Sequence, residues 1–194
     1  DLMHDQLKPL GFGQYTGIDI LGEARGILPS TEWKRRAYKK ADQQRWYSGE
    51  TISLGIGQGY NSFTPLQLAH AVSNLSNNGI VMKPHLVKMV ENGTTKARKL
   101  TVPKESYRIP LRQENIDFVK QAMIGVTKEG TSARSFANAP YISGGKTGTA
   151  QKARPGGRGY EPGAYVASFV GFADASKIGI SRKITLMIAV DEAR

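Results

Sequence analysis

Hydrophobic periodicity predicts two helices in the middle of the chain. Thr64 followed by Pro65 is typical of an N-cap and a first helical position. Hydrophobic residues then recur every three positions along one face, at Leu66, Ala69, Val72 and Leu75. Gly79 ends this helix. The second helix spans residues 112–128 and precedes Gly130, and its apolar face carries Ile116, Val119, Met123 and Val126.

Apolar and alternating segments predict strands in the rest of the chain. They cover residues 80–90, 141–149, 164–173 and 184–190. The sequence "ENGTTK" predicts a hairpin turn, and residues 156–163 predict a loop rich in Pro, Gly and Arg. Residues 1–10 have helical character, and residues 34–44 read as a basic loop or exposed helix. Sequential strands joined by turns favour an antiparallel sheet backed by helices, an α+β fold.

Length and composition narrow the class of protein. The 194 residues suffice for one domain with a hydrophobic core. No apolar run approaches the ~20 residues that a membrane span needs. The absence of cysteine excludes disulfides. The three histidines, His4, His70 and His85, lie too far apart to indicate metal-ligand spacing, so we predict no metal and no cofactor.

The net charge of +11 predicts an anionic partner. The cations are dispersed over four segments, "KRRAYKK", "KARK", "KARPGGR" and "SRK", and no nucleic-acid-binding signature accompanies them. We therefore favour a solvated surface that faces a negatively charged membrane or polymer, and predict no nucleic-acid partner.

The segment "APYISGGKTGTAQ" allows two unrelated sites. A phosphate-binding loop requires a glycine where Pro140 stands, and it requires a helix after Thr147. Proline has no N–H to offer to a phosphate, and Gly148 with the later Pro-Gly-Gly would interrupt a helix. The alternative is a strand, in which Lys146 and Gly148 share one face while Thr147 and Thr149 share the other. We favour the strand.

Lys146-Thr147-Gly148 matches the Lys-Thr-Gly motif of penicillin-binding proteins and class A β-lactamases. The segments "GETISLGIGQGYNSFTPLQLAHAVSNLSNNG", "KPHLV", "GVTKEGTSA" and "GGKTGTAQ" follow the order and spacing of class B penicillin-binding proteins. The segments "FGQYTGIDILGEARGILPS" and "WYSGETISLGIGQGY" resemble the elongation type, penicillin-binding protein 2, of Gram-negative bacteria. The resemblance covers nearly the whole chain. It implies part of a transpeptidase fold like that of the penicillin-binding proteins and serine β-lactamases.

The resemblance implies a D,D-transpeptidase that cross-links peptidoglycan stem peptides through a serine acyl-enzyme and is acylated by β-lactams. Lys146 would then supply positive charge near the substrate carboxylate and the serine. Thr147 and Thr149 would hydrogen-bond that carboxylate, and the Thr149 N–H would complete an oxyanion hole. Gly148 would keep the strand edge open to substrate.

The nucleophile of this family is not evident in the chain. The Ser or Thr residues with a lysine three positions later are Thr31, Thr101, Ser143 and Thr149. Only Ser143 is a serine, and on a strand it points away from Lys146, so we reject all four. Ser76-Asn77-Asn78 matches the family's second motif by letter, but we interpret it as a helix stop. Residues 1–194 are therefore expected to be the C-terminal portion of one transpeptidase domain, with the nucleophile upstream.

The same resemblance implies partners and a location. We expect a membrane glycosyltransferase and elongation-complex scaffold proteins as partners, and the periplasmic face of the inner membrane as the location. Two alternatives stay open: a β-lactam sensor or β-lactamase of the same fold, and a non-catalytic basic binding module. We interpret Trp33, Trp46 and Tyr47 as packing anchors, and the turn at residues 57–59 as tight packing. Gln151, Lys152 and the following loop either border the site or belong to a mobile surface.

Overall fold

The computed structural model describes residues 1–156 and 159–192. The first part of the chain holds short helices, α1 (Leu2–Leu7), η1 (Lys8–Leu10), α2 (Thr31–Ala37), α3 (Ala41–Gln44) and α4 (Ser48–Gly55). The middle part holds α5 (Pro65–Ser76), β1 (Ile80–Met82), β2 (Met89–Glu91), β3 (Arg98–Leu100), β4 (Glu105–Arg108), α6 (Gln113–Lys128) and α7 (Ala133–Phe136). The last part holds β5 (Ile142–Ala153), β6 (Tyr160–Asp174), η2 (Ser176–Ile178) and β7 (Lys183–Asp191).

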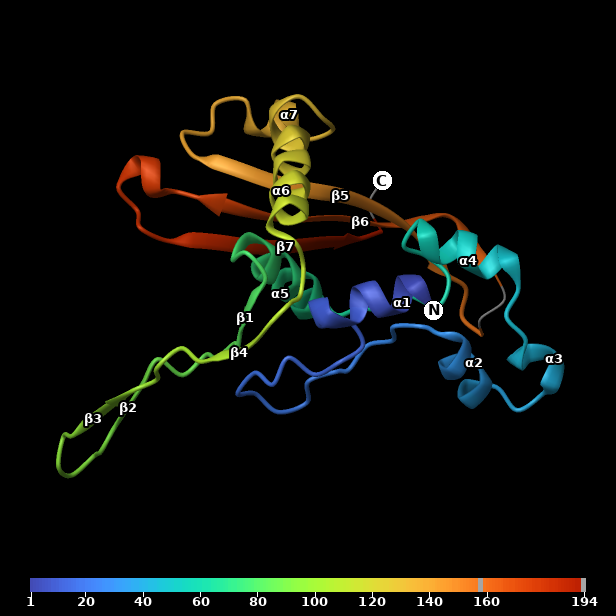
Figure 1. Cartoon of the computed structure of the whole chain (residues 1–194), viewed down its shortest axis with the longest axis horizontal. Helices are drawn as coiled ribbons and strands as arrows, with labels where there is room; N and C mark the ends of the chain where they lie inside the picture. The colour runs from blue at the N-terminus through green and yellow to red at the C-terminus, as the bar shows by residue number, and fades with distance from the viewer. Residues whose placement is uncertain (157–158, 193–194) are drawn as a thin grey trace.

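The last three strands form an antiparallel sheet in the order β5-β6-β7, and helices pack on it. Figure 1 shows α6 crossing this sheet beside β5, with α5 near β7. This arrangement confirms the predicted α+β fold. In the described part of the sheet, β5 is an edge strand, which places the Lys-Thr-Gly segment where one side of the strand is free of sheet neighbours.

The predicted start of β6 was wrong. The strand begins at Tyr160, which pairs with Ala153, so Pro162 lies in the strand instead of in the loop. Pairing with β7 begins only at Val166, and proline is tolerated where a strand has one free side. Residues 157 and 158, which belong to the predicted loop, lie outside the described residues.

Helix α5 begins as predicted, but its buried face differs. The Thr64 side chain accepts from the Gln67 N–H, and the Gln67 side chain accepts from the Thr64 N–H, a capping box. Its fully buried side chains include Gln67, Ala71 and Asn74, whereas Leu66, Ala69, Val72 and Leu75 are half-buried. Ala71 packs against Phe12 and Leu28 of the N-terminal segment. The polar residues are buried because they donate to backbone carbonyls of that segment, at Gln14, Arg25 and Leu10.

Helix α6 follows the predicted bounds within one residue, but its predicted face is only partly correct. Ile116 is buried, whereas Val119 is 43% exposed. The helix packs on β5 through its second half, where Thr127 is buried and donates to the Ser143 carbonyl at 2.6 Å. The inward side of α6 therefore passes through Ile116 and Thr127 and leaves Val119 on the outside.

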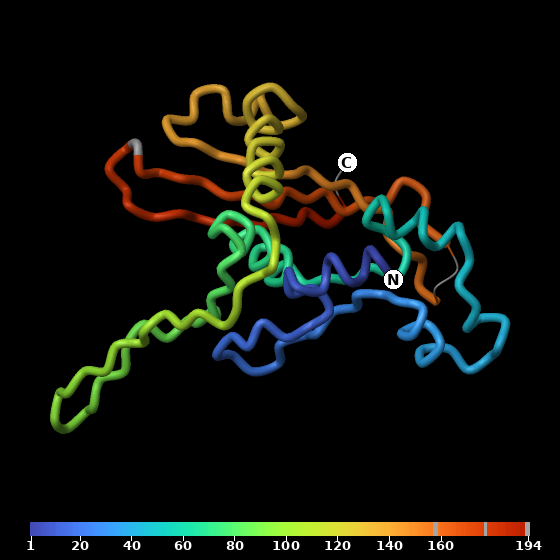
Figure 2. The backbone as a smooth tube through the Cα atoms, viewed as in Figure 1, coloured from blue at the N-terminus to red at the C-terminus, as the bar shows by residue number. Residues whose placement is uncertain are grey.

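The single strand predicted over residues 80–90 was also wrong, because two short strands occupy its ends. β1 pairs with β4, and β2 pairs with β3. Between them Pro84 has no N–H to donate, and the N–H groups of Leu86 and Val87 donate to the Asp19 carboxylate. The predicted turn is confirmed, since the Asn92 side chain accepts from the N–H groups of Thr94 and Thr95. Figure 2 shows this hairpin projecting from the body of the molecule.

The basic stretch at residues 34–44 is not uniformly exposed, contrary to the prediction. Lys34 in α2 is only 2% exposed. Its ammonium donates to the Glu50 carboxylate and, at 2.6 Å, to the Arg45 carbonyl. The rings of Trp46, Tyr47 and Tyr60 lie 5.9, 5.0 and 5.6 Å from the ammonium. The ring centroids of Trp33 and Trp46 lie 5.2 and 6.5 Å from that of Tyr60, so the interpretation of these two as packing anchors is confirmed, whereas Tyr47 is 46% exposed.

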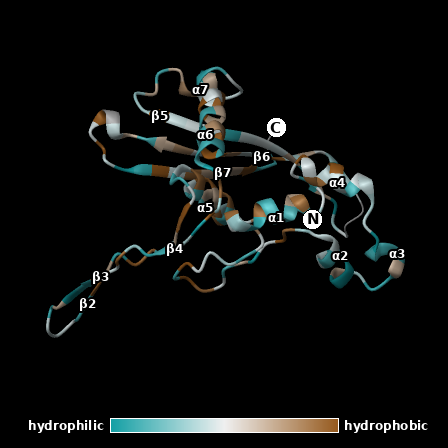
Figure 3. Ribbon diagram, in the orientation of Figure 1, coloured by the Kyte–Doolittle hydropathy of each residue, from teal (hydrophilic) through white to brown (hydrophobic). Residues whose placement is uncertain are grey.

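One face of the sheet is apolar and open. On β7 the alternate residues Ile184, Leu186, Ile188 and Val190 are 54%, 51%, 47% and 52% exposed. Figure 3 shows hydrophobic residues along β6 and β7. The four β7 residues share a face of the sheet with Phe169 of β6. The Phe136 ring of α7 stacks on the Phe169 ring, with 5.6 Å between the ring centroids.

Among the described residues, every helix is too short or too polar to cross a membrane.

Candidate functional site at the lysine strand

The glycines before Lys146 let β5 lie close to its neighbours. A Cβ on Gly144 would lie 2.8 Å from the Phe172 ring and 3.0 Å from the backbone nitrogen of Ile124 in α6. A Cβ on Gly145 would lie 2.2 Å from the Phe169 ring. All three distances are below ordinary van der Waals contact, so only glycine fits here without displacing aromatic side chains. The double glycine therefore fixes the depth at which the strand sits between α6 and β6.

Helix α6 and the segment after it hold β5 from its free side. The Thr127 hydroxyl donates to the Ser143 carbonyl at 2.6 Å in a buried contact. The Thr131 hydroxyl lies 3.2 Å from the Thr147 hydroxyl. Neither threonine was singled out from the sequence, although both belong to the segment "GVTKEGTSA" that carries the family resemblance. The pairing depends on where α6 ends relative to β5, and no local pattern encodes that.

The predicted site residues lie together, on a strand, as expected. Lys146 opposes Val170, Thr147 opposes Phe169 and Thr149 opposes Ala167, so lysine and threonines alternate between the two faces. Lys146 and Thr149 are exposed, while Thr147 and Gly148 are half-buried. The Lys146 ammonium donates to the Thr147 carbonyl at 2.6 Å, and within residues 1–156 and 159–192 it forms no ion pair. The strand thus presents an unneutralised cation on one face and two hydroxyls on the other.

Every second residue of β5 directs its backbone N–H and C=O groups to the free edge of the sheet. In an antiparallel strand, the N–H and C=O of one residue point to the same side, and successive residues alternate. The carbonyls of Ser143 and Thr147 accept bonds from Thr127 and Lys146, outside the sheet ladder. Thr149 is an even number of residues away from both Ser143 and Thr147, so its N–H is also directed to the free edge. An N–H at this position is available to an incoming anion.

The residues that were set aside from the sequence also have clear positions. Ser143 is 8% exposed and opposes Ala173, so it lies on the face opposite Lys146, as expected. Ser76 is the last residue of α5, and Asn78 has φ 56°, which confirms the helix stop. Gly59 has φ 70° and lies in a tight turn. The Gly59 N–H donates to the Tyr160 hydroxyl at 3.4 Å.

Lys152 ties the end of β5 to β7. Its ammonium lies 3.0 Å from the Asp191 carboxylate and 3.3 Å from that of Glu192. The hydrogen bond with Asp191 raises the pKa of the Lys152 ammonium. The contact explains Lys152 as a structural residue of the sheet, whereas Gln151 is exposed at the strand edge. Among the described residues, His, Asp and Glu side chains nowhere gather in a group of three that would hold a metal.

The lysine strand packs on α6 and leaves its polar edge open, and the comparisons with known proteins give the class to which this arrangement belongs. The family model for the penicillin binding protein transpeptidase domain matches residues 1–193. The chain belongs to this family. The sequence resemblance and the expected fold are thereby confirmed.

Individual relatives agree with this assignment. Peptidoglycan D,D-transpeptidase MrdA of Haemophilus influenzae is 39% identical over 161 residues, which are 78% of this chain and 23% of that protein. The chain therefore spans about a quarter of that relative. Penicillin-binding protein 2 of Pseudomonas aeruginosa, solved in complex with WCK 5153, superposes with a TM-score of 0.74 and 34% identity over 98% of this chain and 39% of that one. The penicillin-binding protein 2 of a Helicobacter pylori complex with MreC gives 0.71 and 25% identity over 98% and 31%.

Proposed function

We propose that the full-length protein is a peptidoglycan D,D-transpeptidase that cross-links stem peptides during cell elongation and cell-shape maintenance. It works through a serine acyl-enzyme and is acylated by β-lactams. The observation that carries this proposal is the exposed, unneutralised Lys146 on an edge strand whose other face carries the Thr147 and Thr149 hydroxyls. Relatives at 39% identity that bear the name peptidoglycan D,D-transpeptidase support the reaction.

In this mechanism Lys146 attracts the terminal carboxylate of the stem peptide and holds positive charge near the attacking serine. The hydroxyls of Thr147 and Thr149 donate hydrogen bonds to the carboxylate. The Thr149 N–H, directed to the free edge, donates to the oxyanion that develops when the serine attacks the carbonyl. Preorganised donors of this kind contribute a large part of acyl-transfer catalysis, because they are aimed at charge that appears only in the transition state.

The nucleophilic serine and the family's second motif are proposed to precede Asp1 in the full-length protein, so that residues 1–194 form the C-terminal portion of the transpeptidase domain. The proposed location is the periplasmic face of the inner membrane, with an anchor outside this chain. The proposed partners are a membrane glycosyltransferase and scaffold proteins of the elongation complex. The solved complex of the Helicobacter pylori relative with MreC supports a scaffold partner.

The test is the intact mass of the full-length protein after incubation with a penicillin. One covalent adduct on a serine upstream of Asp1 is expected. Lys146→Ala should slow its formation by about a hundredfold or more, the scale of losing one charge-stabilising group of an acyl-transfer site. Lys183→Ala, which removes an exposed lysine at the start of β7, is the matched control and should acylate at the normal rate.

Other results would select another function. Rapid loss of the adduct, with release of hydrolysed penicillin, would indicate a β-lactamase of the same fold. A stable adduct without cross-linking of peptidoglycan would indicate a β-lactam sensor. No adduct in a folded protein would reject acyl transfer and leave a basic binding module.

A further inference from the structure

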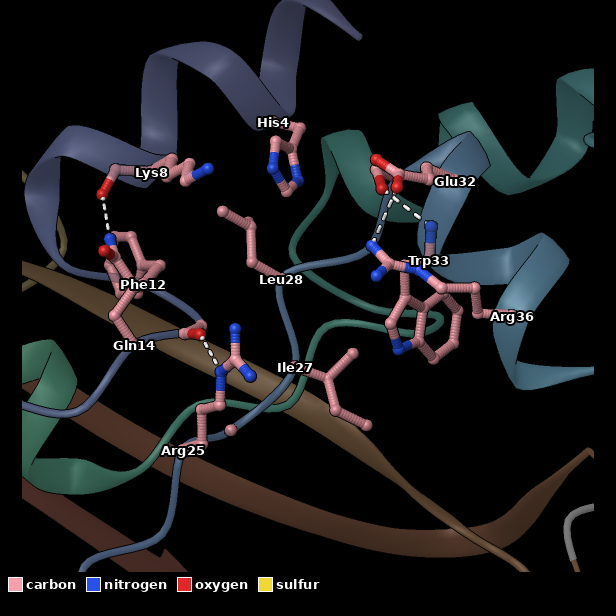
Figure 4. A pocket seen from close by; sticks show the side chains of 13 residues that line it. His4, Lys8, Phe12, Gln14, Arg25, Ile27, Leu28, Glu32, Trp33 and Arg36 are labelled. Carbon is pink, nitrogen blue, oxygen red and sulfur yellow. Dashed lines mark hydrogen bonds and ion pairs between the residues drawn. The ribbon is translucent and has the colours of Figure 1, made fainter.

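A cationic cleft lies between the N-terminal helices and α2. Its volume is about 410 Å³. Its walls carry the charged side chains of Lys8, Arg25, Glu32 and Arg36, and its lining includes Trp33 and the buried residues Phe12 and Leu28. Figure 4 shows Lys8 and Arg25 entering from different sides, with the Arg25 guanidinium directed toward Leu28. No residue of the lysine strand lines this cleft.

Two of the three cations in the cleft form no ion pair within the described residues. Within the described residues, the Lys8 ammonium forms no hydrogen bond or ion pair, and the only Arg25 nitrogen that donates is Nε, to the Gly13 carbonyl at 2.9 Å. That bond orients the guanidinium and leaves its terminal nitrogens available. Arg36 is paired with Glu32 at 3.1 Å. The cleft therefore holds an excess of positive charge that the chain itself does not neutralise.

The cleft wall that bears Arg25 is fixed by a buried amide. Gln67 is 1% exposed, and its Nε2 donates to the carbonyls of Gln14 and Arg25 at 2.8 and 2.7 Å. Gly26 has φ +65°, and a Cβ there would lie 2.5 Å from the Gln67 side-chain oxygen. The backbone from the Arg25 carbonyl to Gly26 is thus held in one position. A preorganised wall lowers the ordering cost of binding a ligand.

We propose that this cleft binds a carboxylate-bearing peptide, namely the acidic stem peptide of peptidoglycan. Guanidinium and ammonium groups form charge-assisted hydrogen bonds with carboxylates, and the Arg fork receives them in a bidentate manner. The Trp33 ring on the cleft wall suits the aliphatic part of a peptide better than a fully hydrated inorganic anion. The identity of the peptide rests on the proposed function, which brings peptidoglycan to this protein.

The experiment uses the full-length protein after acylation with a penicillin, so that the transpeptidase site is occupied. The probe is a peptidoglycan stem tripeptide, which keeps the acidic residues and lacks the terminal D-alanines, and its binding is titrated by calorimetry. We expect saturable binding that weakens as salt rises. Lys8→Glu and Arg25→Glu should each weaken it by about tenfold or more, the loss of one charge-assisted contact.

Arg35→Glu is the matched control, because Arg35 neighbours Arg36 on α2, is exposed and does not line the cleft. It should change the affinity by less than about twofold, since a solvated charge outside the cleft is screened. Lys8→Glu breaks no hydrogen bond or ion pair among the described residues, so the fold is expected to tolerate it. Thermal unfolding of each variant checks this.

Three results would overturn the proposal. They are an absence of saturable binding, an equal loss of affinity in Arg35→Glu, and competition by inorganic phosphate at the concentration of the tripeptide. If any of them occurs while the penicillin adduct forms, the cleft assignment is wrong and the proposed function stands. If no adduct forms, the proposed function is wrong, and the same titration on the unmodified protein decides the cleft.

Discussion

Lys34 and Lys146 have the same side chain in opposite environments. Lys34 is 2% exposed, ion-paired with Glu50 and enclosed by Trp46, Tyr47 and Tyr60. Lys146 is exposed on an edge strand and has no acidic partner among the described residues. The charge of Lys34 is used within the fold, whereas the charge of Lys146 remains available to a ligand. A cation therefore becomes a candidate for function when the chain leaves it unneutralised.

The largest expected effect comes from replacing each of these two lysines with methionine. Lys34→Met should lower the free energy of unfolding of the full-length protein by about 3–5 kcal/mol, because it leaves the Glu50 carboxylate without its partner. Lys146→Met should change that free energy by less than about 0.5 kcal/mol, as an exposed position does. Urea unfolding of both variants measures this. Penicillin acylation should show the reverse order, and a Lys146→Met variant that acylates normally would contradict the comparison.

The next effect separates two glycines of the lysine strand. Gly145→Ala should destabilise by about 1–3 kcal/mol, because its Cβ would overlap the Phe169 ring and approach the Val170 carbonyl. Gly148→Ala should cost less than about 1 kcal/mol, because its Cβ meets only the Ser168 hydroxyl, which can rotate away. Thermal unfolding measures both. Equal destabilisation would mean that the two glycines serve the same packing purpose.

The sequence predicts those features that depend on neighbouring residues. Thr64 and Pro65 mark the start of α5 because a cap and a first helical position are local properties. The strand character of the Lys-Thr-Gly segment also follows from its own residues, and the order of the segments around it identifies the family. The alternation of Lys146 and Thr147 between two faces needs only the strand geometry.

Features that depend on partners distant in the chain cannot be predicted from local sequence patterns. The burial of Lys34 requires Glu50 and Tyr60, which reach it only after α3 and α4 have turned the chain back. The contact between Thr131 and Thr147 requires α6 to end beside β5. The inward face of α5 follows Gln67 and Asn74 because the N-terminal segment offers them carbonyls. In each case the partner decides whether a polar residue is exposed or buried.

Acid should affect the Lys34 environment before it affects the lysine strand. Burial by itself would raise the pKa of Glu50, but hydrogen bonds from Lys34, the Tyr47 N–H and the Tyr60 hydroxyl outweigh it and lower that pKa below its ordinary value of 4.5. A carboxyl group with a lowered pKa in the folded state stabilises the fold above its ordinary pKa. This stabilisation is lost as the pH falls below 4.5 and through the folded-state pKa.

The unfolding temperature of the natural protein should consequently fall more steeply below pH 4.5 than that of Glu50→Gln, which has no charge to lose. Glu114→Gln is the control, because Glu114 forms an exposed ion pair with Arg112. Its pH profile should follow that of the natural protein. Identical profiles for the natural protein and Glu50→Gln would show that the buried pair does not respond to acid.

The smallest expected effect concerns the hydroxyl that positions Thr147. Thr131→Val keeps the shape of the side chain and removes its hydrogen bond to Thr147, so the Thr147 hydroxyl loses a contact that restricts its orientation. The penicillin acylation rate should fall about two- to tenfold, the scale of one neutral hydrogen bond, with an unchanged unfolding temperature. Thr94→Val, on the β2–β3 hairpin, should leave both quantities unchanged. A normal rate in Thr131→Val would mean that β5 and the hydroxyl contact of Thr127 suffice to orient Thr147.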